Sequence, residues 1–157
     1  EEGVKSFIVK KILDVLNSRL AYYLQKMDAN CVCTFNEFFE EQIVNEKGEN
    51  CSYFNFSGAE RKNIDLAILF TFMDMRRLQG EVAYNIVIFD ELLDSSLDEK
   101  GVELVISLLT ERVDTYKENI YIISHRKESA KAATGDVITL QKQNSITTRV
   151  DFLEETQ

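Results

Sequence analysis

Two adjacent carboxylates, Asp90 and Glu91, follow directly on an apolar run that begins after Asn85. The run has the composition of a buried strand, so both acids are expected at the edge of a sheet. There, one carboxylate can hold the water shell of a Mg²⁺ ion, and the next can orient a water molecule for attack on a phosphate. Acids at this position also suit the start of a following helix, because negative charge is favourable at a helix N-terminus.

A second candidate element is the segment FSGAERKNIDLA at residues 56–67, which places Ser57 and Gly58 directly before an amphipathic helix. Backbone amides at a helix start, beside a hydroxyl and without a bulky side chain, form a surface that binds phosphate. Ser57 and Glu60 also have the spacing of a capping box, in which the two residues satisfy the helix start internally. Both roles are compatible with each other.

Two shorter motifs follow the acids. SLD at residues 96–98 contains Ser96 and Asp98, and IISHR at residues 122–126 ends the next apolar strand with His125, the only histidine of the chain. A single histidine most often packs or lies on the surface. At a strand end beside an acidic pair, however, it is a candidate for a phosphate contact.

The spacing of apolar residues predicts the elements that position these groups. Residues 4–27 carry one apolar stripe, which predicts a helix of about six or seven turns. The other expected elements are strands within VCTFN and FFEEQIV, a turn at EKGEN, helices at about 60–78 and 99–113, strands at 85–90 and 119–124, a short helix near 127–133, and a terminal hairpin of DVITLQ and SITTRVDF. The inward face expected for helix 60–78 consists of Ile64, Ala67, Ile68, Thr71, Phe72 and Met75.

The middle of the chain therefore alternates helices with strands that are apolar throughout. This order predicts an α/β fold, mainly a parallel sheet with helices covering both faces. Ligands of such sheets bind beyond the carboxyl ends of the strands. Asp90, Glu91, Ser124 and His125 all fall at such ends.

The composition limits the class of protein. A chain of 157 residues with 45% apolar residues suits one domain with its own core, and its first residue is not Met, so we expect a piece of a longer protein. With 27 acidic and 18 basic residues, the net charge of −9 disfavours a surface that grips nucleic acid throughout. Cys31, Cys33 and Cys51 lack the spacing of a zinc site and are expected as free thiols in a reducing cytosol. No apolar run approaches the roughly 18 residues that span a bilayer, and the first residues do not have the pattern of a signal peptide.

The four motifs, in this order, resemble the C-terminal half of an ATP-binding-cassette (ABC) ATPase head. SG-x-E before a helix is similar to the signature motif, the strand ending in DE to Walker B, SLD to the D-loop, and SH to the H-loop. The long opening helix resembles the point where a coiled coil re-enters the head in SbcC-type ATPases, the SMC-related class of DNA double-strand-break repair. YFNFSGAERKNIDLAILFTFMDM and IFDELLDSSLDEKG are similar to the large ATPase subunits of T-even-type phage recombination endonucleases.

The resemblance implies a fold and a domain organisation. Residues 1–157 would be the C-terminal lobe of an ABC-type P-loop NTPase head, with a coiled-coil base helix at 1–28 and the four motifs within 29–157. In the nucleotide site of its own head, Asp90 would order Mg²⁺, Glu91 would polarise the attacking water, and His125 would reach the γ-phosphate. These roles make ATP and Mg²⁺ the expected cofactors.

The resemblance also assigns residues that act on the nucleotide of a second head. The signature residues would contact it in trans, and they are Ser57, Gly58, Ala59 and Glu60. Ser96 and Asp98 would belong to the D-loop that crosses between the heads. Ala59 stands where the family has a second glycine, and Asn63 stands where an arginine is common. The segment from Asp90 to Asp98 is one residue longer than the usual spacing.

No GxxxxGK(S/T) motif occurs in the sequence, so the chain lacks the loop that cradles nucleotide phosphates. The isolated chain is therefore predicted to be inactive, and the resemblance implies an N-terminal lobe of the same subunit as a partner. It further implies a second head in a homodimer, a nuclease subunit docked near residues 4–27, and double-stranded DNA. The place of action would be the cytoplasm, that of the host cell if a phage encodes the protein.

Two other classes of function remain open from the residues themselves. A stand-alone Mg²⁺-dependent nuclease or phosphatase would use Asp90, Glu91, Asp94 and Asp98 as a metal cluster, but it leaves FSGAE and ISH without a role. A non-catalytic dimerisation module derived from such a head is the other alternative. Metal-dependent hydrolysis without ATP would favour the first, and ATP-dependent pairing after a P-loop lobe is added would favour the ATPase.

Overall fold

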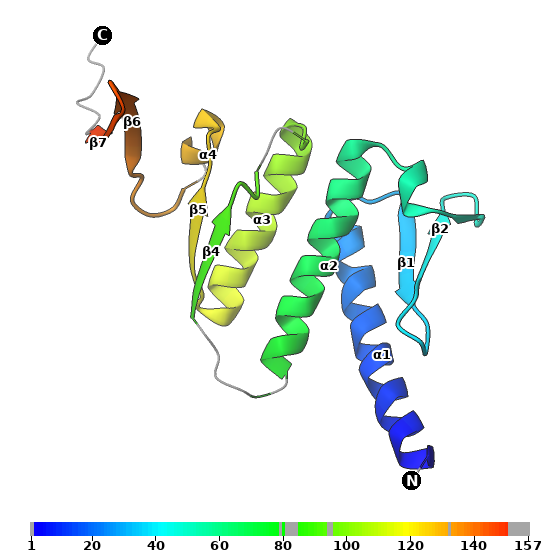
Figure 1. The fold of residues 1–157 in the computed structure, drawn as a ribbon. Coiled ribbons are helices and arrows are strands. Elements are labelled where there is room, and N and C mark those ends of the chain that lie inside the picture. The colour runs from blue at the N-terminus through cyan, green and yellow to red at the C-terminus, as the bar shows by residue number, and fades with distance from the viewer. Residues whose placement is uncertain (1, 79, 81–84, 94–95, 132, 151–157) are drawn as a thin grey trace.

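The computed structural model describes residues 2–78, 80, 85–93, 96–131 and 133–150 of the chain. Its elements in chain order are α1 (Glu2–Lys26), β1 (Cys31–Phe35), β2 (Glu41–Asn45), β3 (Asn50–Cys51), the short 3-10 turn η1 (Tyr53–Asn55), α2 (Gly58–Leu78), β4 (Ile86–Asp90), α3 (Glu99–Tyr116), β5 (Asn119–Ile123), α4 (Lys127–Lys131), β6 (Thr139–Gln143) and β7 (Ile146–Val150). Three helices form the centre, with β1–β3 beyond α1 and the pair β4–β5 beyond α3 (Figure 1). Among the described helices, none has the length and apolar composition to cross a membrane.

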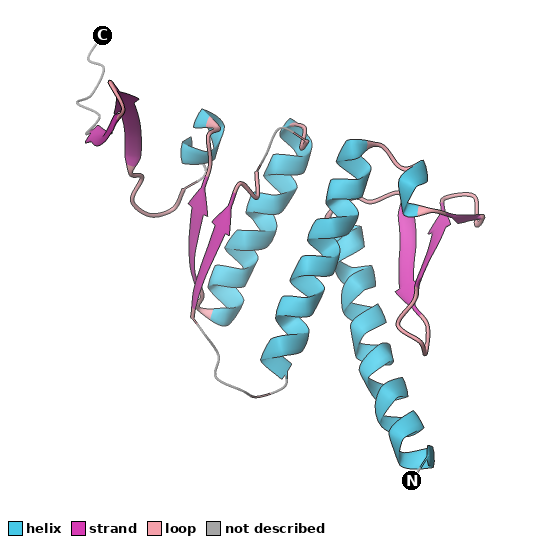
Figure 2. Cartoon of the chain, in the orientation of Figure 1, coloured by secondary structure: helices cyan, strands magenta, loops and turns pink. Residues whose placement is uncertain are grey.

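The strands of the described residues form separate small sheets (Figure 2). β1, β2 and β3 form an antiparallel sheet, β6 and β7 an antiparallel hairpin, and only β4 and β5 pair in parallel. The predicted parallel arrangement therefore holds for the two strands that precede the candidate acids and His125. The terminal hairpin is confirmed, but its turn lies at Asn144 and Ser145, which both have positive φ angles, rather than at 142–144. Residues 151 and 152 of the expected last strand lie outside the described residues.

The predicted N-terminal helix is confirmed as α1, which packs against α2 and β1. Its apolar stripe is buried in the second half, where Leu16, Leu20 and Met27 are at most 2% exposed. Asn17 ties the helix to β1, because its amide exchanges hydrogen bonds of 2.9 and 2.8 Å with the backbone of Phe35. In the first half the stripe faces solvent, and its exposed residues are Val4, Phe7, Ile8, Ile12 and Val15.

The second predicted helix is confirmed as α2, but part of its expected inward face is wrong. Phe72 is 52% exposed, whereas Phe70 is fully buried and stacks at a tilt on Tyr23, with ring centroids 5.5 Å apart. Asp74, a charged residue, is also buried. Because α2 packs between α1 and α3, its buried surface is wider than a single stripe and includes residues that bond to α3.

The pair β4–β5 has one buried and one open face. Phe89 packs edge-on against Phe70 of α2 at 6.3 Å between ring centroids, and this side of the sheet meets the common core. The opposite side carries apolar side chains that are 53–64% exposed, namely Ile86, Ile88, Tyr121 and Ile123. The expected cover of helices on both faces is therefore not met within the described part of the chain.

The three cysteines are free thiols, as their spacing predicts. Cys33 is buried in the sheet β1–β3, and burial raises the pKa of its thiol to about 12. Cys31 and Cys51 are half-buried. With its pKa so high, Cys33 stays protonated at neutral pH and behaves as a small apolar core residue.

Candidate functional site

The ends of β4 and β5 bring Glu91 and His125 into contact. In the parallel register Asp90 lies beside Ile123, and the backbone N–H of Glu91 donates a 2.9 Å hydrogen bond to the Ile123 carbonyl. Glu91 directly follows β4 and His125 lies two residues after β5, and His125 Nε2 is 3.2 Å from Glu91 Oε1. Two residues more than thirty positions apart thus meet because their strands are parallel neighbours.

Glu91 has a left-handed backbone, with φ of 53°. This conformation disfavours side chains with a Cβ by about 1–2 kcal/mol, so the surrounding structure must compensate for it. The hydrogen bond to Ile123 does so in part, because it holds the peptide at the point where the chain leaves the sheet. The carboxylate of Glu91 contacts His125, which follows β5.

Both groups of this pair are open to solvent. The side chain of His125 is 89% exposed and that of Glu91 is 62% exposed, and Asp90 beside them is also exposed. An exposed polar contact of this kind contributes at most about 1 kcal/mol to stability. The stability of the fold therefore gives no reason for placing a histidine and two acids at this edge.

The acids fit Mg²⁺ as part of a shared site. Mg²⁺ in nucleotide enzymes is bound by one or two carboxylates, with phosphate oxygens and water completing its octahedron. The exposed Asp90 can supply such a ligand. Among the described residues, no group of three or more His, Cys, Asp or Glu side chains could hold a metal on its own. Asp94, a member of the metal cluster considered above, lies outside the described residues.

The start of α2 is a complete capping box. The Ser57 N–H donates to Glu60 Oε2 at 2.8 Å, and the Glu60 N–H donates to Ser57 Oγ at 3.3 Å. The hydrogen bond from the Ser57 backbone lowers the pKa of Glu60, followed by the contribution of the Ser57 side chain. Because a lowered pKa stabilises the folded state above the pKa of the unfolded chain, this contribution is lost as acid protonates Glu60. The structural role predicted for Ser57 is thus confirmed, while its contact with a nucleotide stays a prediction.

Gly58 lies in open space at this helix start. A Cβ built on Gly58 would meet no heavy atom within 4 Å, so no internal packing requires glycine there. At the start of α3 the opposite holds, since a Cβ on Gly101 would lie 3.0 Å from Asp98 Oδ1 and 3.1 Å from Leu97 Cδ2. Because Gly58 has no side chain and the space beside it is empty, an external group can approach the backbone amides at the start of α2.

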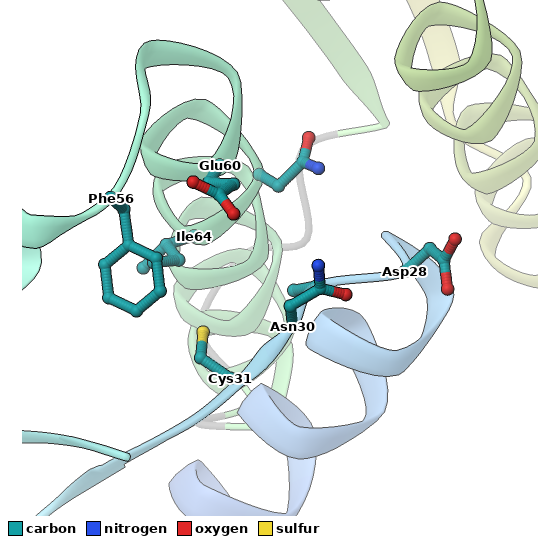
Figure 3. A pocket seen from close by; sticks show the side chains of 8 residues that line it. Asp28, Asn30, Cys31, Phe56, Glu60 and Ile64 are labelled. Atoms are coloured by element: carbon teal, nitrogen blue, oxygen red, sulfur yellow. The ribbon is translucent and has the colours of Figure 1, made fainter. Parts of the chain in front are cut away.

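A small cavity of about 30 Å³ adjoins the same helix start. In Figure 3, Phe56, Glu60 and Ile64 surround it from the α2 side, and Asn30 and Cys31 from the segment after α1. Asn63 also lines it; its amide donates to the Met27 carbonyl at 3.4 Å, while its buried Oδ1 has no hydrogen-bond partner among the described residues. The cavity is large enough for one water molecule, which such an oxygen would bind.

Asp98 is the N-cap of α3 and accepts a 2.7 Å hydrogen bond from the Gly101 N–H. Its side chain is exposed, as is that of Ser96, while Leu97 between them is buried and anchors the segment. The helices α2 and α3 begin at the same end of the molecule at which β4 and β5 end (Figure 1). All predicted site residues therefore lie at one end of the molecule, in two groups on different elements.

A buried ionic cluster was not predicted from the sequence. Tyr23, Asp74, Arg112 and Glu118 form it, and each is at most 4% exposed. The sequence feature that could have predicted this cluster is a charged residue on the apolar face of each helix, namely Asp74 in α2 and Arg112 in α3. Burial lowers the pKa of Arg112, but hydrogen bonds to Glu118 and Asp74 outweigh it and leave the pKa raised, so the guanidinium stays charged.

Comparison with known proteins supports one class. No protein-family model matches the chain. Its sequence is 35% identical over 132 residues to exonuclease subunit 2 of Escherichia phage RB69, a match that covers 84% of this chain and 23% of that protein. Exonuclease subunit 2 of Enterobacteria phage T4 is 35% identical over 126 residues, which are 80% of this chain and 22% of that protein. The chain thus spans about a quarter of the length of these curated relatives.

Solved structures agree in fold. A chain from a study of ATP-driven dimerization and DNA-stimulated activation of SMC ATPases has a TM-score of 0.72 at 16% identity, covering 92% of this chain and 88% of its own. The Smc head domain of Pyrococcus furiosus with an extended coiled coil, bound to the C-terminal domain of ScpA, has 0.71 at 16% identity, over 95% and 37%. The SMC head domain of Thermotoga maritima has 0.62 at 20% identity, over 92% and 51%.

The fold is therefore that of SMC ATPase head domains, as the order of the motifs predicts. Within this class, the sequence is similar to exonuclease subunit 2 of phages RB69 and T4, in agreement with the predicted resemblance to the T-even-type phage family.

Proposed function

We propose that the chain is the C-terminal lobe of the ATPase subunit of a DNA double-strand-break repair and recombination nuclease complex, acting in the host cytoplasm. ATP would pair two heads, and this pairing would control DNA binding and access of the nuclease to DNA. The observation that carries the proposal is the contact of Glu91 with His125 at the ends of adjacent parallel strands. The similarity to two phage exonuclease subunits supports a nuclease complex as the setting.

Each residue of the pair has a separate task. Glu91 orients a water molecule and accepts its proton, while His125 donates a hydrogen bond to the phosphate under attack. Asp90, one residue earlier on β4, would bind the Mg²⁺ ion through its water shell. Bound Mg²⁺–ATP supplies the phosphate to be attacked and the positive charge that stabilises its oxygens. In the structure without ligand, the carboxylate of Glu91 already contacts His125.

The open face of β4–β5 supports an N-terminal lobe as partner. A parallel pair of strands is normally covered on both sides, yet Ile86, Ile88, Tyr121 and Ile123 are exposed. Burying this apolar face against a further part of the subunit would also bring a phosphate-cradling loop to Asp90. Relatives that are about four times longer have the chain length to supply such a lobe.

The second group of residues would act across a pair of heads. Ser57, Gly58, Ala59 and Glu60 present the start of α2, and Ser96 and Asp98 the start of α3, to the nucleotide of the opposite head. The open space at Gly58 leaves the approach that a γ-phosphate needs. The exposed apolar half of α1, which includes Phe7 and Ile8, offers a docking surface for the nuclease subunit near the coiled-coil base. DNA would lie across the paired heads.

Replacing His125 with alanine tests the role that we propose for the contact between Glu91 and His125. In the complete subunit we expect His125→Ala to lower kcat for ATP by about 10²- to 10³-fold, because one preorganised donor to the phosphate is lost. The free energy of unfolding should change by less than about 1 kcal/mol, since the exposed pair contributes little to stability. Steady-state ATPase assays and urea unfolding measure the two effects. Glu103→Ala, an exposed substitution on α3, is the matched control, and equal ATPase rates for both variants would contradict the role of His125.

A further inference from the structure

The buried ionic cluster joins three helices through one guanidinium. Arg112 of α3 donates from Nη1 to Asp74 Oδ1 at 2.6 Å and to the Tyr23 hydroxyl at 2.9 Å. Its Nε and Nη2 donate to the two oxygens of Glu118, at 3.0 Å each. The Tyr23 hydroxyl in turn donates to Asp74 Oδ2 at 2.7 Å. We call Tyr23, Asp74, Arg112 and Glu118 the Arg112 network.

Stability alone does not account for this network. Removing charges from water is costly, and apolar residues of similar volume often replace a buried ion pair without loss. An ionic network can fix the relative orientation of the elements that it joins, because a guanidinium donates hydrogen bonds to its partners only in a fixed geometry. With Nε, Nη1 and Nη2 all bonded, Arg112 fixes how α3 lies against Asp74 of α2 and Tyr23 of α1.

An open pocket lies between α1 and α3 beside the network. Its volume is about 180 Å³, and Arg19, Tyr22, Glu111 and Thr115 line it together with Tyr23 and Arg112. Polar side chains bridge the two helices, as in the contacts of Glu111 with Tyr22 and Lys26. Beside the network, hydrogen bonds with defined directions therefore join these helices in addition to the apolar core that they share.

The network lies at the far end of both helices from the candidate trans residues. Asp74 is about 25 Å along α2 from Ser57, and Arg112 is about 21 Å along α3 from Asp98. Both helices begin at the same end of the molecule (Figure 1). A tilt of about 5° at the network would move Ser57 by about 2 Å. Misplacement by about 1 Å can lower a catalytic rate about 10²-fold.

We propose that Arg112, through Asp74 and Tyr23, is a positioning residue that fixes α2 and α3 as one unit, so that Ser57 and Asp98 reach the opposite head's nucleotide together. This inference rests on the proposed function of paired heads. Arg112 touches no nucleotide. It acts on the site of the partner head and leaves the Asp90–Glu91 site of its own head intact.

Arg112→Lys tests this role, because lysine keeps the charge and loses the fork. Two differently tagged complete subunits are mixed with ATP, and single-turnover hydrolysis is measured in two arrangements. In the split arrangement, Arg112→Lys is in one head and Glu91→Gln in the other, so both lesions affect one nucleotide and the second site is intact. In the joined arrangement, one head carries both substitutions and both sites are impaired. We expect hydrolysis to be about ten- to hundredfold faster in the split arrangement.

Two control variants separate positioning from folding and from the proposed function. Val105→Ala removes buried volume from α3 without touching the network, and should give equal rates in both arrangements. Ser57→Arg should show the same arrangement dependence as Arg112→Lys. Equal rates for Arg112→Lys, while Ser57→Arg keeps its dependence, would overturn the positioning role alone. Equal rates for Ser57→Arg as well would overturn the proposed function and this inference with it.

A milder variant keeps the test decisive if Arg112→Lys does not fold. Tyr23→Phe removes only the hydroxyl that bridges Arg112 and Asp74, and the ring can stay packed on Phe70. We expect the split arrangement to be faster again, by about two- to tenfold, since one bridging group of the network is lost. Equal rates in both arrangements would then overturn the positioning role.

Discussion

Glu91→Gln in the complete subunit is expected to keep ATP binding and to lower the hydrolysis rate by about 10²- to 10⁴-fold. The amide preserves the size of the side chain but lacks the charge that orients the water molecule and accepts its proton. Its contact with His125 is exposed, so the fold should be unaffected. Because nucleotide then persists between the heads, ATP should trap them as a pair, which light scattering detects as a doubling of mass.

Two results would contradict the role of Glu91. Turnover at the wild-type rate would show that another group activates the water. Loss of ATP binding, measured by equilibrium titration with labelled nucleotide, would indicate that the carboxylate holds the ligand and does not act in the hydrolysis step. Glu99→Gln, at the start of α3 and outside the candidate site, is the matched control for the same chemical change.

Combining Glu91→Gln with Ser57→Arg in mixed heads is expected to give the second large effect. With the two substitutions in opposite heads, both lesions fall on one nucleotide and the other site keeps all its groups, so hydrolysis should proceed at about half the wild-type rate. With both in one head, each site has one lesion, and the rate should fall at least about 10²-fold. A single-turnover measurement excludes coupling between successive cycles.

If Ser57 serves only as a helix cap, the two arrangements should hydrolyse ATP at equal rates. Ser57 and Glu60 form a capping box, and its loss would cost about 1 kcal/mol in either arrangement. Equal rates in the two arrangements would therefore assign Ser57 to the helix start alone. A faster rate with both substitutions in one head would refute the assignment of Ser57 to the opposite nucleotide.

The sequence predicts local structure and the meeting of strand ends well, for a physical reason. Apolar spacing indicates where helices form, and α1, α2 and α3 lie at the expected segments, although Phe72 and the first half of the α1 stripe are exposed. Parallel neighbours place their carboxyl ends together, so the contact of Glu91 with His125 follows once β4 and β5 are recognised as a pair. The motifs and their order then indicate the class of head.

Features that depend on distant partners are not predicted by the same means. Asp74 is buried because Arg112, 38 positions later, neutralises it, and no local pattern contains that information. Phe72 has the spacing of an inward residue but is exposed, since α2 turns Phe70 to the core instead. The open face of β4–β5 has the apolar composition of a buried sheet, which agrees with the proposal that a further lobe covers it.

We propose that the Asp90–Glu91 edge is half of a nucleotide site. The most direct test is Mg²⁺-dependent ATP hydrolysis by the purified chain, measured before and after addition of the N-terminal lobe of the same subunit, with Asp90→Ala as control. We expect no hydrolysis by the chain alone, turnover once the lobe is added, and none with Asp90→Ala. Hydrolysis by the chain alone that survives Asp90→Ala would contradict this proposal.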